Sequence, residues 1–160
     1  MKELLPRRDW LFVVRTPFHL AEVKAGEKTW WCADRRCKRG DRAFIYVPLE
    51  GVRWFLRVID VLDPSQSQTF CESFKMATVV AKILNVFTPP IKARQLRADP
   101  NVRLEGFVGR NFQAKAFMIR SDAATDAILA ITKRPRSEAK SQHSRLLQRV
   151  RDLERRYASR

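Results

Sequence analysis

The sequence has few of the residues and motifs on which common enzyme classes depend. Histidine occurs only at His19 and His143, so histidine catalysis has little to draw on. The chain has no glycine-rich phosphate loop, no metalloprotease motif, and no Ser, His and Asp in the arrangement of a nucleophilic hydrolase. We therefore expect a binding protein without catalytic activity or a cofactor.

Long apolar runs are also absent. No stretch reaches the 18 apolar residues of a membrane span, and the segment Met1 to Pro6 is too short for the apolar part of a signal peptide. Cysteine occurs only three times, an odd number that fits a reducing cytosol better than a disulfide framework. These features predict a cytoplasmic protein that has no membrane contact and whose cysteines remain thiols.

Acidic residues are scarce relative to basic ones. The 160 residues include 32 Lys and Arg but only 17 Asp and Glu, which gives a formal net charge of +15. A charge of this size attracts polyanions, and nucleic acid, either DNA or RNA, is the default partner. Because 45% of the residues are hydrophobic, the chain has enough apolar material for a core and is not a disordered basic polymer.

The charge is concentrated near the end of the chain. Residues 133–160 hold 10 basic and 3 acidic side chains. We predict a folded domain over residues 1–132, a basic linker over 133–143 and a basic amphipathic helix over 144–160. The helix has an apolar stripe at Leu146, Val150, Leu153 and Tyr157. It would bind phosphates through Arg145, Arg149 and Arg156, dock a partner protein, or pack against its own domain.

The sequence of the domain predicts an α+β fold of five to six mostly antiparallel strands with short flanking helices. Short strands without an alternation of strand and helix favour a small mixed barrel over a doubly wound sheet. Strands are predicted at 10–14, 29–32, 42–47, 52–62, 76–87 and 117–119. Helices are predicted at 17–25, 92–98 and 121–131, with a loop over 101–113 and a strand end at Pro89-Pro90.

The order of motifs resembles the PUA-like superfamily. The tryptophan strand is followed by Val23-Lys24-Ala25-Gly26-Glu27-Lys28-Thr29-Trp30-Trp31 and then by Lys38-Arg39-Gly40-Asp41 before an aromatic strand. The second half, with Thr88-Pro89-Pro90-Ile91 and Gly109-Arg110-Asn111-Phe112-Gln113, is similar to the EVE branch, and the ASCH branch is the second choice. The resemblance covers residues 8 to 131. It implies a pseudo-barrel whose cleft holds a modified or flipped-out base in an aromatic pocket.

Tryptophan supplies the candidate stacking surface of that pocket. Neighbouring side chains of a strand point to opposite faces, so Trp30 and Trp31 cannot both face the core. Since cysteine is commonly buried, Cys32 predicts that Trp30 faces the core and that Trp31 faces the cleft. Trp10 is a further candidate for the pocket, although a structural role suits it as well. The indole ring stacks on any base.

Two polar segments complete the predicted site. Asn111 and Gln113 carry both donors and acceptors and suit the edge of a base, and Phe112 lies between them. Phosphate contacts are predicted for the basic residues Arg35, Arg36, Lys38, Arg39 and Arg110. The alternative for residues 110–113 is an ordinary loop whose amides satisfy buried backbone groups, and the alternative for the basic run at 35–39 is a solvated loop.

Two other site types have weaker support from the sequence. Lys28 and Thr29 resemble the pair found in small ASCH-like amidohydrolases that act on modified nucleosides, with Glu50 or Glu72 as the acid. A zinc site would require Cys32, Cys37 and Cys71 together with His19. We expect neither a metal nor hydrolysis.

Overall fold

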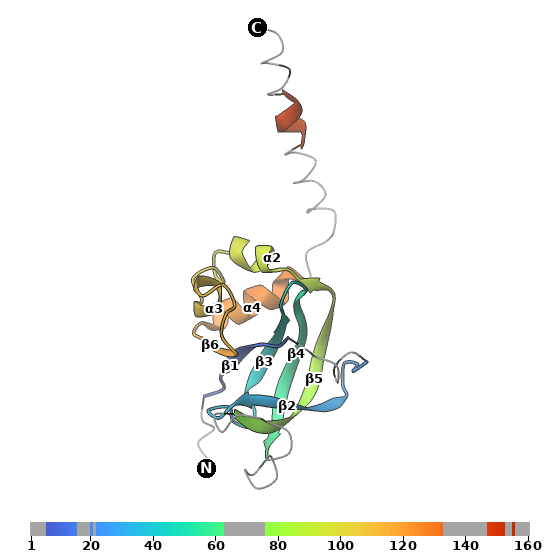
Figure 1. Cartoon of the computed structure of the whole chain (residues 1–160), viewed down its shortest axis with the longest axis vertical. Helices are drawn as coiled ribbons and strands as arrows, with labels where there is room; N and C mark the ends of the chain where they lie inside the picture. Colours follow the sequence, from blue (N-terminus) through green and yellow to red (C-terminus); the bar gives the residue numbers. More distant parts are fainter. Residues whose placement is uncertain are drawn as a thin grey trace.

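The computed structural model describes residues 6–15, 20, 22–62, 76–132, 147–152 and 155. They form one six-stranded mixed sheet accompanied by short helices, so the expected α+β class is confirmed (Figure 1). The strands are β1 (Asp9–Val13), β2 (Lys28–Asp34), β3 (Arg42–Val47), β4 (Gly51–Val61), β5 (Met76–Ile91) and β6 (Ala116–Ile119). The helices of the domain are α2 (Ala93–Ala98), α3 (Gly106–Gly109) and α4 (Asp122–Ile131).

The sheet has the strand order β2-β5-β4-β3-β1-β6. Every neighbouring pair is antiparallel except β1 and β3, which are parallel, so the expected antiparallel majority is confirmed. The sheet is not a closed barrel, because the outer strands β2 and β6 each pair on one side only. The expected small barrel is thus replaced by an open sheet.

Both faces of the sheet bury apolar side chains. In β3, Phe44 and Tyr46 face a first core cluster together with buried residues of α2, α3 and α4. The alternate residues Ala43, Ile45 and Val47 face a second cluster. That cluster also contains Trp31 and Ala33 of β2, although β2 pairs only with the distant strand β5. The sheet is therefore curled, so that β2 packs over the face of the sheet that carries the second cluster.

The course of β5 differs from the prediction. Pro89-Pro90 was expected to end this strand, but β5 continues to Ile91. Its pairing with β2 ends at Lys82, and Ile83 still bonds the backbone of Gly26 and Glu27, so only the residues beyond Ile83 pair with β4 alone. Proline lacks an N–H group and is tolerated where one side of a strand makes no ladder bond. The short helix α3 was likewise not predicted. Of the expected helix at 17–25, residues 17–19 and 21 lie outside the described residues, and residues 22–25 form turns and irregular backbone instead of a helix.

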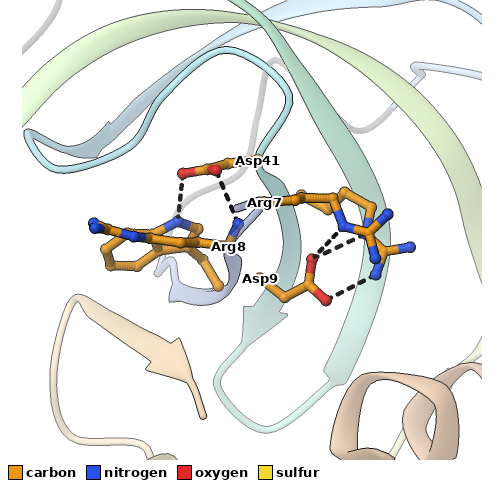
Figure 2. A network of polar contacts seen from close by, with 6 residues as sticks. Arg7, Arg8, Asp9 and Asp41 are labelled. Atoms are coloured by element: carbon orange, nitrogen blue, oxygen red, sulfur yellow. Dashed lines mark hydrogen bonds and ion pairs between the residues drawn. The ribbon is translucent and has the colours of Figure 1, made fainter. Parts of the chain in front are cut away.

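Two buried carboxylates hold β1 against β3 (Figure 2). Asp41 accepts hydrogen bonds from the backbone N–H of Arg8 at 3.0 Å, from Trp10 Nε1 at 3.1 Å and from the backbone N–H of Lys38 at 3.0 Å. Asp9 accepts two bonds from the Arg42 guanidinium, at 2.9 and 2.8 Å. These bonds raise the pKa of Arg42 above its usual value. The Gly40-Asp41 motif therefore has a structural role at the start of both strands.

The basic tail is described only in part. Residues 147–152 and 155, which lie within the predicted helix, are helical and exposed. The linker and the stripe residues Leu146, Leu153 and Tyr157 lie outside the described residues, so the division of the chain into three parts stays a prediction. Among the helices that the structure describes, none has the length and apolar character needed to cross a membrane.

Candidate functional site

A cleft of about 1600 Å³ lies where several chain segments meet. The end of β1 and the middle of β2 form part of its wall, and the turn between β3 and β4 forms a lip. The start of α2 and the loop before β6 complete it. Its lining residues are Phe12, Val13, Val14, Arg15, Trp30, Trp31, Cys32, Tyr46, Pro48, Leu49, Glu50, Gly51, Met76, Lys92, Ala93, Arg97, Asn111, Phe112, Gln113, Ala114 and Lys115.

The cleft brings together five of the six residues predicted for the base pocket. These are Trp30, Trp31, Asn111, Phe112 and Gln113, which come from segments about eighty residues apart. The sixth, Trp10, does not line the cleft. Its side chain is fully buried in the second core cluster, where its Nε1 donates to Asp41. The structure thus places Trp10 in the core, which was the alternative considered for it.

The two adjacent tryptophans face opposite to the prediction. Trp31 is 4% exposed and packs in the second core cluster, whereas Trp30 is 37% exposed. Cys32 was taken to mark the core face, but it is disulfide-bonded and only partly buried. Because Cys32 is in a disulfide, its residue type does not mark the core face as a buried thiol would. The prediction that all three cysteines stay thiols is wrong for Cys32. Trp30 offers the accessible indole of the cleft.

An aromatic stack forms a second surface of the cleft. The rings of Tyr46 and Phe112 lie 4.2 Å apart with an interplanar angle of 7°. The Arg97 guanidinium lies over the Phe112 ring, with Cζ 5.6 Å from its centre, and donates a hydrogen bond to Asn111 Oδ1. Burial raises the pKa of the Tyr46 phenol above its usual value. Neither Tyr46 nor Arg97 was among the residues predicted for the pocket.

The loop that carries Asn111 and Phe112 has an unusual backbone. Both residues have positive φ angles, +50° for Asn111 and +58° for Phe112. Asparagine tolerates this region, but a bulky aromatic residue seldom adopts it, at a cost on the order of 1–3 kcal/mol. The Phe112 N–H donates to the carbonyl of Phe107 at 2.8 Å, and the Phe112 ring packs against Tyr46 and Phe107. These contacts hold the loop in the conformation that turns Asn111 toward Arg97.

The positive charge of the cleft comes from residues that were not predicted. Arg15, Lys92, Arg97 and Lys115 line it, against one acid, Glu50, which is paired with Arg53 at 2.9 Å. Lys92 and Arg97 are five residues apart, whereas Arg15 and Lys115 lie far from them in the sequence, so no single local run of charge marks all four.

The residues predicted to bind phosphate do not line this cleft. Arg35, Lys38, Arg39 and Arg110 are exposed elsewhere. Arg36 is held by Asp34 at 3.0 Å, and its guanidinium lies 5.4 Å from the centre of the Trp10 ring. Arg149 is exposed on the tail helix, and Arg145 and Arg156 lie outside the described residues.

The two alternative sites gain no support from the arrangement. Lys28 and Thr29 are absent from the cleft, whereas Glu50 is on its lip, and Glu72 lies outside the described residues. For a zinc site, Cys32 is disulfide-bonded, and burial raises the pKa of the Cys37 thiol far above its usual value. In the described ranges, no three His, Cys, Asp or Glu side chains are grouped so that they could hold a metal ion.

Several solved structures share this fold. A protein from Pseudomonas syringae has a TM-score of 0.60 and 15% identity, covering 78% of this chain and 99% of its own. A protein from Pseudomonas putida has a TM-score of 0.59 and 16% identity, with the same two coverages. A hypothetical protein from Leishmania major has a TM-score of 0.58 and 15% identity, covering 80% of this chain and 96% of its own. At this identity the likeness shows the fold alone.

No protein-family model and no curated protein matches the sequence. The class that fold and cleft define is therefore an α+β domain whose open, curled sheet carries a large basic and aromatic cleft.

Proposed function

We propose that this cleft binds nucleic acid and holds one base, including a modified base, against its aromatic surfaces. The observation that carries the proposal is the meeting of three kinds of side chain in one cleft. An exposed indole, two exposed amide side chains and four basic residues line the same space. Each kind contacts a different part of a nucleotide.

The aromatic and amide groups would bind the base. Trp30 is accessible for stacking, which is worth about 1–3 kcal/mol per base in proteins that bind single strands. The Asn111 Oδ1 accepts a bond from Arg97, which leaves the Asn111 amide N–H groups to donate to the edge of a base. The exposed Gln113 amide can donate and accept. Neutral groups of this kind supply selectivity that phosphate contacts lack.

The basic groups would hold the sugar–phosphate backbone. In the described part of the chain, no ion pair joins Arg15, Lys92, Arg97 or Lys115 to a carboxylate. The volume of about 1600 Å³ exceeds the roughly 300–1000 Å³ of common small-molecule sites. An extended ligand with a charged backbone suits both observations.

The resemblance to the PUA-like superfamily and its EVE branch points in the same direction. We infer that the curled sheet is an open form of that pseudo-barrel, and that the protein is a non-catalytic reader. Its basic loop at residues 35–39 and its basic tail would add salt-sensitive affinity for phosphates. A partner protein on the tail helix stays the alternative for that segment.

The test is binding of fluorescent oligonucleotides, followed by anisotropy, across plain and methylated DNA and RNA. We expect Trp30→Ala to weaken binding by about tenfold to a hundredfold, because one stacking contact is lost. Arg97→Gln should weaken it by about tenfold. Arg57→Gln, a change of an exposed arginine outside the cleft, is the matched control. Affinities of Trp30→Ala and Arg97→Gln equal to that of the control would place the binding site elsewhere.

A further inference from the structure

The turn between β3 and β4 carries a residue that is unusual for its position. The Glu50 N–H donates to the Val47 carbonyl at 3.1 Å, which closes a four-residue turn. Pro48 occupies its second position and Leu49 its third, with a φ angle of +70°. This is the pattern of a type II turn, in which the third position normally holds Gly or Asn. A branched side chain such as leucine disfavours this backbone conformation.

Leu49 is also unusual in its exposure. Its side chain is 99% exposed, more than any other large hydrophobic residue in the described ranges. An apolar side chain in water adds nothing to folding, and its backbone conformation is unfavourable. Leu49 thus has an unfavourable backbone conformation and an exposed apolar side chain, and neither adds to the packing of the fold. Departures of this kind from local rules are expected at functional positions.

The turn holds Leu49 in a defined place at the cleft. The flanking residues Val47 and Gly51 are buried in the sheet, and Glu50 is paired with Arg53 at 2.9 Å. Pro48 restricts the backbone further. All four residues from Pro48 to Gly51 line the cleft, whose lining also contains Trp30. Leu49 is thus an apolar point on the lip of the cleft that we propose binds a base.

We propose that Leu49 is a wedge that enters the base stack of a duplex beside the base held in the cleft. The inference rests on the proposed function and adds the form of the ligand, a double-stranded nucleic acid. A base leaves the stack only if its stacking contacts with the neighbouring bases are broken. Apolar side chains such as leucine stabilise this unstacked state by inserting between base steps. The four basic residues that line the same cleft would hold the backbone on either side.

A protein partner fits this surface less well. Protein interfaces are built around a group of apolar residues that become buried together. Leu49 is flanked by Pro48 and the charged Glu50, and Leu104, the other nearly fully exposed leucine among the described residues, does not line the cleft. Leu49 and Trp30 are the two exposed apolar residues that line the cleft, and its other exposed lining residues are charged or carry amides, which suits a nucleic acid better than the apolar centre of a protein interface.

The test is Leu49→Asn, because asparagine tolerates a positive φ angle and keeps the turn. We expect binding to a duplex to weaken by about tenfold, because the stabilised unstacked state is lost, and binding to a single strand to stay unchanged. A 2-aminopurine placed next to the target base should brighten with the parent protein and remain dim with Leu49→Asn. Leu104→Asn, the same change at a leucine that is 84% exposed and outside the cleft, should behave like the parent.

The outcomes separate the two proposals. If the parent protein binds neither duplexes nor single strands, the proposed function fails. If the parent binds and Leu49→Asn gives the same duplex affinity and the same 2-aminopurine signal, the wedge is wrong. An equal loss for duplex and single strand would also overturn it, because Leu49 would then be a general contact of the cleft.

Discussion

Gly51→Ala is expected to lower the free energy of unfolding by about 3 kcal/mol or more. A Cβ atom at this position would lie 2.1 Å from the carbonyl oxygen and 2.8 Å from the carbonyl carbon of Ile91. Both atoms belong to backbone, which cannot turn aside as a flexible side chain can. The φ angle of Gly51 is +114°, which adds a conformational penalty for any L residue. Relief would require separation of β4 from β5 where Val52 pairs with Ile91.

Gly26→Ala is the matched control for this effect. Gly26 has a comparable φ angle of +91°, but a Cβ atom there would meet nothing within 4 Å. Its cost should be limited to the backbone conformation, about 1–2 kcal/mol. Urea denaturation of the parent and both variants measures the difference. Equal losses for the two variants would show that β4 and β5 do not approach each other as closely as described.

Asp41→Asn is expected to cost about 2–4 kcal/mol of folding free energy. Its two carboxylate oxygens accept three bonds, one on Oδ1 from Arg8 and two on Oδ2 from Trp10 and Lys38. An asparagine of the same shape has only one oxygen, so its amide nitrogen must face at least one buried donor. That donor loses its partner in a site that is 3% exposed.

The control for Asp41→Asn is the same change at Asp126, which is exposed on α4. A surface substitution of this kind should stay within about 0.5 kcal/mol. Thermal unfolding followed by circular dichroism gives both values. If Asp41→Asn is as stable as Asp126→Asn, the Gly40-Asp41 motif does not hold β1 and β3 together.

Local patterns were sufficient for most of the secondary structure. The apolar segments at β1, β3 and β4 and the turn residues between them appear in the sequence at nearly their structural positions. The end of β5 was predicted wrongly at Pro89-Pro90. A strand segment that pairs with a neighbour on one side only accepts proline, and no local sequence signal shows which segments pair in this way. The curling of the sheet is likewise a tertiary property.

The site could be predicted where the type of a residue determines that it lines the cleft. It could not be predicted where the packing of the fold determines this. Trp30, Asn111 and Gln113 were selected for their chemistry and do line the cleft. Trp10 and Trp31 have the same indole side chain as Trp30. However, Trp10 lies in the core, where it is hydrogen-bonded to Asp41, and Trp31 is buried by the curled sheet. Arg97 and Tyr46 belong to the site only through the fold around Phe112. No run of charge or aromatic residues could have identified them.

The central claim, that this cleft is the nucleic-acid site, is tested most directly by photocrosslinking. The parent protein is irradiated with an oligonucleotide that carries a photoreactive base, and the crosslinked peptides are identified by mass spectrometry. Crosslinks are expected at residues 30–32 and 111–115, which line the cleft. Crosslinks confined to the basic residues 35–39 or to the tail at 133–160 would contradict it, because binding would then follow charge alone.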